Sequence, residues 1–465
     1  MSKKKSRSRK RKLARANSQR AQQKKLILQM EALEPKQLLT NFHVTSIADD
    51  GSGGLTLREA FDQAETLLGD DTITFDFANQ TINLTQGELR HGTFGGGLTI
   101  YGNGNTVNQT VEDERVFNFT GTSVIDGQFQ IDDGRAPEEF DVTIEDLTVS
   151  GGNLEIQSLL AGVRENLLVE TNHENSIFSG GGIRFNSTGT LQLVNTQVVN
   201  NSTSELNSKG GGVFAVGRVV LLSNEDGGSL VSGNSTGQSG LFSDVGINGE
   251  LGVGGGIYSE TSVVVDNSTV SGNRTFGYSA VGGGIAARQS VRLINGAIVE
   301  NNYTSGRYSH GGGIYAGGNV KDRSTPEFDY ERTFGIVEVL DGSRVQNNQT
   351  NLRFSRGGGI HGGIVSVRDN SYVTGNSTLG RISHGGGVYA SGHFELENSH
   401  LTNNSATGGI TRLGEIACRV GVEAAMSVVS HFVPAGGVLA FLETAYGYFS
   451  RLNDYIELLL SLIHI

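Results

Sequence analysis

The chain has 465 residues, with 68 glycines, 4 prolines and no tryptophan. Glycine is about twice as frequent as usual. It does not recur at every third position, which excludes collagen. The small number of prolines excludes a proline-rich disordered tract. Residues 1–25 hold 12 Lys or Arg and no acid, whereas the rest holds 24 basic and 48 acidic residues, so the acidic body is not expected to bind nucleic acid.

Residues 1–40 are predicted to be a basic sorting segment that is disordered by itself, with helical character between about residues 12 and 30. The segment Leu33-Glu34-Pro35-Lys36-Gln37-Leu38-Leu39 resembles the LEPR-x-LL stretch at the start of many very large planctomycete surface proteins, with Lys36 in the Arg position. The resemblance implies export or sorting. A basic tail of a cytoplasmic protein and a nucleic-acid-binding tail are the alternatives.

Residues 41–150 are predicted to form an N-terminal cap and the first coils of a β structure. Alternating patterns predict short strands at 72–75, 81–84 and 98–101. An amphipathic helix is expected from Leu55 to about Leu68, where it would cover the open core and free strand edges of a first coil. Its apolar face is Leu57, Ala60, Phe61, Ala64, Leu67 and Leu68.

The same region carries an ordered set of short motifs. Thr56-Leu57-Arg58-Glu59-Ala60, with Leu55 in front of it, is followed by Asp71–Phe75, Ile100–Gly104 and Leu147–Gly152. This series resembles the CSLREA domain that begins many bacterial β-helix surface proteins, with Leu55 where that family has Cys. The resemblance implies a β-helix at the cell surface, and the Cys-to-Leu change removes any thiol role.

Residues 151–409 are periodic. Triple glycines followed by Ile or Val recur at intervals of 28 to 30 residues, with two longer intervals of 44 and 46. An asparagine precedes the triplet by nine residues in five of six intervals and by twenty in the other. The triplets begin at Gly180, Gly210, Gly254, Gly282, Gly311, Gly357 and Gly385, and the asparagines are Asn201, Asn234, Asn273, Asn302, Asn348, Asn376 and Asn404.

This period predicts an all-β chain, a right-handed parallel β-helix of the pectate-lyase type, with three strands and three turns per coil. The marker asparagines and glycines are expected at bends that need positive φ. Stacking at about 4.8 Å would align the asparagines into a ladder of hydrogen-bonded amides. It would also align an aliphatic ladder of Ile257, Ile285, Ile314, Ile360 and Val388.

The repeat units resemble the GGA-I and F-x-x-N motifs of chlamydial polymorphic outer membrane proteins. This chain has Gly-Gly-Gly-Ile and Val-x-x-Asn instead, as in Val270-Ser271-Gly272-Asn273. The resemblance implies an adhesin. Helical repeats are excluded because glycine triplets would destabilise each helix, and propeller blades need about 40–45 residues.

The second long interval contains a candidate ligand loop, because aromatic side chains among charged ones suit contacts with glycans or proteins. A neutral surface loop is the alternative. The candidate residues are Arg323, Phe328, Tyr330 and Arg332.

No catalytic residue is predicted. The acidic pairs Asp49-Asp50, Asp70-Asp71 and Asp132-Asp133 all precede the clear repeats, and the Gly-His-Gly and Arg-Ile-Lys motifs of polygalacturonase-like β-helices are absent. The two Asp-Asp-Gly turns are weak calcium candidates, a plain turn being the favoured interpretation, and no other metal or cofactor is expected. His310 and His384 precede triplets at a variable position that is interpreted as solvent-exposed.

Residues 410–465 break the repeat and are rich in helix formers. The terminal Leu460-Ser461-Leu462-Ile463-His464-Ile465 is the in-frame translation of a common transposase adaptor, so the tail is expected to be artefactual or chimeric. A genuine amphipathic or membrane segment is the alternative, although residues 428–442 are a poor span. Membrane association is therefore expected only through a missing or unrecognised anchor.

These features together predict a non-enzymatic β-helix protein of the bacterial cell surface or the secreted space, with an adhesive or envelope role. Its expected partners are glycans or surface proteins. The runner-up is a secreted polysaccharide lyase or glycoside hydrolase on the same scaffold, because β-helices host both kinds of function.

Overall fold

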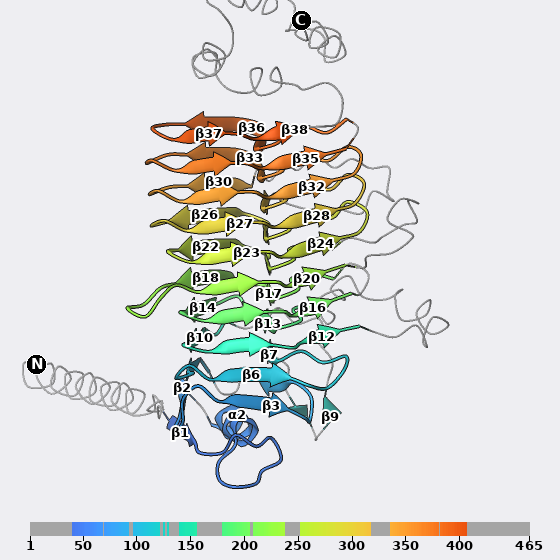
Figure 1. Ribbon diagram of the computed structural model, residues 1–465. Coiled ribbons are helices and arrows are strands. Elements are labelled where there is room, and N and C mark those ends of the chain that lie inside the picture. The colour runs from blue at the N-terminus through green and yellow to red at the C-terminus, as the bar shows by residue number, and fades with distance from the viewer. Residues whose placement is uncertain are drawn as a thin grey trace, which may run out of the picture. The chain divides into compact units, whose positions relative to one another are not determined.

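The computed structural model describes residues 40–67, 69–92, 96–120, 139–155, 179–204, 208–237, 252–317, 335–380 and 382–406, together with the strand pair 124–125 and 128–129. They form a parallel β-helix, as predicted, in which successive coils stack along one axis (Figure 1). The basic segment 1–39 and the tail 410–465 lie outside the described residues, so the expectations for them stay predictions.

One coil illustrates the architecture. Strands β21 (Ile257–Ser259) and β22 (Ser262–Asp266) belong to the first sheet, β23 (Thr269–Ser271) to the second and β24 (Arg274–Phe276) to the third. The coil thus has three sides, as expected, but its first side is split into two segments. We call the row that contains β22 row one of the first sheet and the row that contains β21 row two.

The strands of the first sheet pair coil to coil. Row one consists of β1 (Thr40–Val44), β2 (Asp71–Phe75), β5 (Leu98–Tyr101), β10 (Val142–Glu145), β14 (Thr190–Val194), β18 (Arg218–Leu222), β22, β26 (Ser290–Ile294) and β30 (Ile336–Val339). Row two consists of β4 (Leu89–His91), β7 (Phe117–Thr120), β13 (Ile183–Asn186), β17 (Val213–Ala215), β21, β25 (Ile285–Ala287) and β29 (Ile314–Ala316). The rows merge in β33 (Ile360–Val367) and β36 (Val388–Leu396).

The other two sheets are uninterrupted ladders. The second consists of β3 (Thr81–Leu84), β6 (Thr106–Gln109), β11 (Thr148–Ser150), β15 (Gln197–Val199), β19 (Leu230–Ser232), β23, β27 (Ile298–Glu300), β31 (Arg344–Gln346), β34 (Tyr372–Thr374) and β37 (His400–Thr402). The third consists of β12 (Asn153–Leu154), β16 (Ser202–Thr203), β20 (Ser235–Thr236), β24, β28 (Tyr303–Ser305), β32 (Gln349–Asn351), β35 (Ser377–Leu379) and β38 (Ser405–Ala406). A short antiparallel pair joins β8 (Val124–Ile125) and β9 (Gln128–Phe129).

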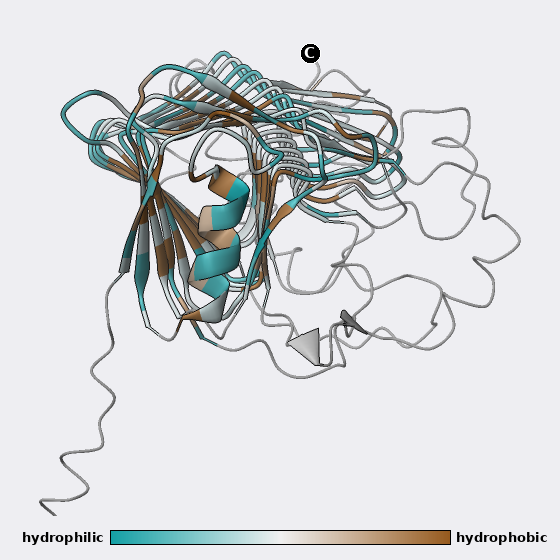
Figure 2. Ribbon diagram, turned by 90° about the horizontal axis from the view of Figure 1, so that it is seen from below, coloured by the Kyte–Doolittle hydropathy of each residue, from teal (hydrophilic) through white to brown (hydrophobic). Residues whose placement is uncertain are grey.

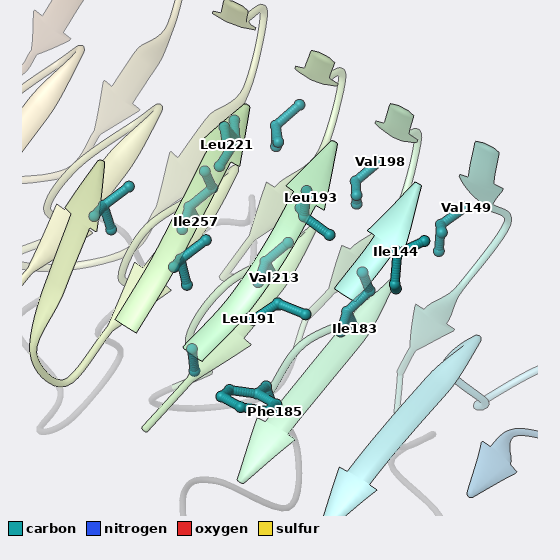
Figure 3. Packing of buried hydrophobic residues seen from close by; sticks show 14 of the residues in the cluster. Ile144, Val149, Ile183, Phe185, Leu191, Leu193, Val198, Val213, Leu221 and Ile257 are labelled. Atoms are coloured by element: carbon teal, nitrogen blue, oxygen red, sulfur yellow. The ribbon is translucent and has the colours of Figure 1, made fainter. Parts of the chain in front are cut away.

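The aliphatic ladder runs through the core as predicted. From Ile257 to Val388 its members pair in consecutive register and are at most 6% exposed. The ladder continues towards the N-terminus through Val213 and Ile183 to Phe117. In Figure 3 the side chains of Ile183, Val213 and Ile257 lie in this interior together with Val198 of the second sheet. Each fully buried aliphatic side chain contributes about 1.5–3 kcal/mol, so the stack is stabilised coil by coil.

Helix α2 (Leu57–Thr66) caps the first coil, and Figure 2 shows it lying across that end of the stack. Its Phe61 ring stacks on Phe117 of β7 at 5.6 Å. The helix ends earlier than predicted, because the chain becomes extended at Leu67, which is 40% exposed and not on the buried face. In the part of the chain that the structure describes, no helix has the length and apolar character needed to cross a bilayer.

The start of the helix is fixed by a capping box. The Thr56 hydroxyl accepts a hydrogen bond from Glu59 N–H at 3.3 Å, and the Glu59 carboxylate accepts one from Thr56 N–H at 2.9 Å. Arg58 adds two hydrogen bonds to the Asp49 carboxylate, from Nε at 2.8 Å and from Nη2 at 3.1 Å. The Thr-Leu-Arg-Glu-Ala motif therefore consists of a cap, two core contacts, at Leu57 and Ala60, and two polar anchors.

We expect Thr56→Ala to lower the stability of the capped end by about 1 kcal/mol, because it removes the N-cap acceptor. Urea denaturation followed by circular dichroism measures the change. Thr66→Ala is the matched control, since the Thr66 hydroxyl bonds only to Gln63 O in the exposed last turn. Equal losses in the two variants would contradict the role given to the capping box.

The marker asparagines form a hydrogen-bonded ladder inside the stack. Asn302 Oδ1 accepts from Asn273 N–H at 2.9 Å and from Asn273 Nδ2 at 3.0 Å, and Asn302 Nδ2 donates to Asn348 Oδ1 at 3.0 Å and to Val270 O at 3.0 Å. The same amide-to-amide bond links each marker from Asn201 to Asn404.

The prediction that these asparagines themselves have positive φ is wrong. The residue before each ladder asparagine takes that conformation, as Gly272 (φ 65°) and Asn301 (φ 56°) do. The ladder residue itself turns its amide inwards, which positive φ one residue earlier makes possible.

The three glycines of a triplet serve different purposes. The first has positive φ in every coil, 66° at Gly357 for example. The second has no room for a side chain, since a Cβ on Gly358 would lie 2.3 Å from both Gly386 O and Ser377 O. The third packs on the ladder amide, because a Cβ on Gly359 would lie 2.8 Å from Asn376 Cγ.

Candidate functional site

The candidate ligand loop, Arg323, Phe328, Tyr330 and Arg332, lies outside the described residues, and so does the acidic pair Asp132-Asp133. The other acidic pairs have structural partners. The Asp49 carboxylate accepts from Thr85 N–H at 2.7 Å and from Gln86 N–H at 3.0 Å, in addition to Arg58. Within the described ranges, no three His, Cys, Asp or Glu side chains lie together in a way that could hold a metal ion.

A buried charge cluster joins the first coils. Glu88 pairs with Arg115 at 2.8 Å and Arg90 at 2.6 Å, and it accepts from Asn118 Nδ2 at 2.8 Å. Burial alone would raise the pKa of Glu88, but the two guanidinium groups and the amide together hold it below its ordinary value. The cluster stabilises the junction of the first coils.

The lowered pKa of Glu88 makes the stability of the fold depend on pH. A carboxylate whose pKa is lower in the folded chain stabilises the fold above its unfolded pKa of about 4.3, and that contribution is lost as the pH falls through the folded pKa. We expect Glu88→Gln to cost about 2 kcal/mol at neutral pH and progressively less in acid, as measured by urea denaturation across the pH range. Glu338→Gln, in a surface pair, should cost less than about 0.5 kcal/mol. A Glu88→Gln cost that does not change with pH would contradict the assignment.

The outer surface shows a separation of charge. Residues 274–288, 303–317, 349–363 and 377–391 contain six arginines and three histidines and no acid. They are equivalent stretches of four successive coils, each running from the third sheet into row two of the first sheet. The acidic residues of these coils that the structure describes lie instead on row one, the second sheet and the turn between them: Asp266, Glu300, Glu338, Asp341, Asp369, Glu395 and Glu397.

The centre of the acid-free stretch is a turn that we call the basic turn, residues 277–281, 306–310, 352–356 and 380–384. Its copies are bonded to one another through the backbone. Tyr308 N–H donates to Arg353 O at 3.0 Å, and single bridges pair His310 with Arg356 and Arg356 with His384. The turn is thus a rigid ridge parallel to the axis of the stack.

Aromatic rings and guanidinium groups stack along this ridge. The rings of Tyr308 and Phe354 are parallel within 7° at a centroid distance of 4.7 Å. Arg307 Cζ lies 5.4 Å from the Tyr308 ring, and Arg353 Cζ lies 5.3 Å from the Phe354 ring. Arg353 and Arg356 are exposed. Among the described residues no carboxylate forms an ion pair with Arg307, Arg353 or Arg356.

The basic turn also holds bulky residues in a strained backbone conformation. Tyr308, Phe354 and Ile382 have φ of 66°, 65° and 61°. Ser279 and Leu352 of the same turn also have positive φ, 62° and 75°. Outside the basic turn, positive φ among the described residues is taken by Gly, Asn or Asp. A left-handed conformation costs other residues roughly 1–2 kcal/mol, and such strain clusters at functional sites. The repeated use of bulky residues where glycine would be easier is a sign of selection for something other than stability.

Row two adds a second line of rings beside the ridge. Tyr315, His361 and Tyr389 are in register, with centroid distances of 5.1 and 5.0 Å, and His310 lies 4.7 Å from His361. Burial raises the pKa of Tyr315 to about 12, so its hydroxyl stays protonated.

The prediction that the residue directly before each glycine triplet is solvent-exposed is wrong. Val253 and Val281 are buried there, at 6% and 1%, and His310 is half-buried. The position is variable because it borders this outer layer, whose neighbouring side chains change from coil to coil.

At the N-terminal border of the acid-free stretches lies one carboxylate, Glu260, whose charge is balanced by two cations. Glu260 accepts from Lys209 Nζ at 3.2 Å and from Tyr258 OH at 2.8 Å, and it pairs with Arg288 at 2.6 Å. Burial lowers the pKa of Lys209. Two cations facing one anion leave this border without a net negative charge.

The basic turn was not predicted from the sequence, although a signal was present. Aligning the coils on their triplets places Arg307, Arg353 and Arg381 four residues before the first glycine. A basic residue stands directly before that glycine in four coils, at Lys209, His310, Arg356 and His384. The absence of acids from those stretches is equally visible, in a body with twice as many acidic as basic residues.

Comparison of the chain with protein-family models, with curated proteins and with solved structures gives no match.

Proposed function

We propose that this chain is a non-enzymatic β-helix protein of the cell surface or the secreted space that adheres to its ligand through the basic turn. The observation that carries the proposal is the acid-free ridge with its exposed arginines and strained rings. In a chain with a negative body, a positive ridge gives up the stabilisation that its arginines would gain from pairing with the chain's own acids. Binding of an external ligand is the simplest reason for such a ridge.

Two further points support the proposal. The ridge is built on a scaffold of backbone-paired turns, so the backbone of the contact residues is already ordered and loses little conformational entropy on binding. The resemblances to CSLREA proteins and to chlamydial surface proteins imply the same location and role. The ligands expected are glycans or surface proteins that carry acidic groups.

The test exposes a panel of neutral and acidic glycans, and whole cells, to the full chain in the presence of calcium. We expect retention on some members and no release of reducing ends or unsaturated uronates. Release of either product would replace the adhesive function by that of a hydrolase or lyase. Absence of binding to every glycan and every cell type would overturn the proposal itself.

A further inference from the structure

The ridge points to one class of ligand, and this inference rests on the proposed adhesive function. We infer that the basic turn binds a linear anionic polysaccharide, carboxylated or sulfated, that lies parallel to the axis of the stack and contacts at least three successive coils. The direction of the ridge, its charge and the stacking of its rings favour this class of ligand.

The direction follows from the repeat. Cationic side chains occur once or twice in each of three successive turns, at Arg307, at Arg353 and Arg356, and in the sequence at Arg381, whereas residues 277–281 have none. Coils are about 4.8 Å apart, so these three turns span roughly 10 Å along the axis of the stack. A small anion would use one coil, whereas a polymer with acidic groups along its length can use all of them together and gain avidity from each.

The rings distinguish a polysaccharide from a single-stranded nucleic acid. Nucleic acid binders stack bases on exposed aromatic faces. Here Tyr308 and Phe354 face each other, and Arg307 Cζ lies 5.4 and 5.6 Å from their centroids. Each of these two rings therefore turns one face to the other ring, and that face is closed to a base. Aromatic edges carry partial positive charge, so they favour carboxylate or sulfate groups and offer no platform for a base.

Charge separation makes the ridge selective. Among the described acidic residues of the same coils, Glu338 and Glu395 lie on row one and are paired with Arg292 and Arg368. A polyanion is repelled from the acidic side and attracted to the ridge, which fixes its position around the coil.

The test uses the full chain and measures affinity for heparin and polygalacturonate fragments: disaccharide, hexasaccharide and dodecasaccharide. We expect affinity to increase with length and to fall as salt is added. The triple variant Arg307→Gln, Arg353→Gln, Arg356→Gln should bind the longest fragment at least about tenfold more weakly. The control Arg292→Gln, Arg344→Gln, Arg368→Gln removes the same number of charges from neighbouring coils and should stay within about twofold.

A second pair of variants separates binding from folding. Tyr308→Asn and Phe354→Asn place in the turn the residue that tolerates positive φ elsewhere in this chain. We expect thermal stability to be kept and affinity to fall, which a purely structural role of the rings would not produce.

Several results would overturn the inference while leaving the adhesive function in place. They are equal affinity for the disaccharide and the dodecasaccharide, equal losses in the two triple variants, and equal binding of single-stranded DNA, polyglutamate or neutral dextran. Loss of binding to every glycan and cell would instead remove the proposed function on which the inference rests.

Discussion

Gly358→Ala is expected to remove the C-terminal coils from the stack at a cost above about 4 kcal/mol. The new Cβ would lie 2.3 Å from Gly386 O and from Ser377 O, and both atoms belong to the backbone. No side-chain rotation can relieve such a contact, so the coils must separate. Because each repeat touches only its neighbours, the loss should be local. Hydrogen exchange of the coils around β35 and β36 measures it, together with the first transition in urea.

Gly342→Ala is the matched control in the preceding turn. Nothing lies within 4 Å of its Cβ, and only its φ of 73° is unfavourable for alanine. We expect a cost of about 1–2 kcal/mol. Equal stability of the two variants would contradict the explanation that the close approach of the coils requires glycine at position 358.

Asn302→Ala is expected to cost about 3–5 kcal/mol. The substitution removes two hydrogen bonds that Asn302 donates, and it leaves the Asn273 backbone N–H and Asn273 Nδ2 without their Asn302 acceptor. Both donors belong to a residue that is fully buried. An unsatisfied buried group costs about 1–3 kcal/mol, and two of them account for most of the expected value. Urea denaturation of the full chain measures the change.

The control for the ladder is Asn267→Gly in the same coil as Asn273. Asn267 is exposed and has φ of 43°, which glycine adopts freely, and its side chain bonds only to Ser223 Oγ at 3.2 Å. The cost should stay below about 0.5 kcal/mol. A similar cost at both positions would mean that the buried amide ladder contributes no more than a surface turn.

The scaffold could be predicted because its ladder residues recur in every coil. The proposed ligand surface could not, because its residues differ from coil to coil. Strict spacing identified Ile257 and Asn302 as ladder positions, since pairing distances constrain every coil in the same way. Three strands per coil were predicted, whereas the split of the first sheet into two rows gives most coils a fourth, as β21 and β22 show. The strain at Tyr308 was not visible, since its φ depends on the turn and the residue type argues against it.

The asparagine ladder also has a direction. In each step the N–H and the amide of one coil donate to the Oδ1 of the next coil towards the C-terminus, as Asn348 does to Asn376. An intact coil therefore depends on its C-terminal neighbour to satisfy its own buried donors. Force applied from that side would detach one coil at a time, each release exposing the donors of the coil behind it. Under tension the stack would therefore lengthen in a series of steps of one repeat each.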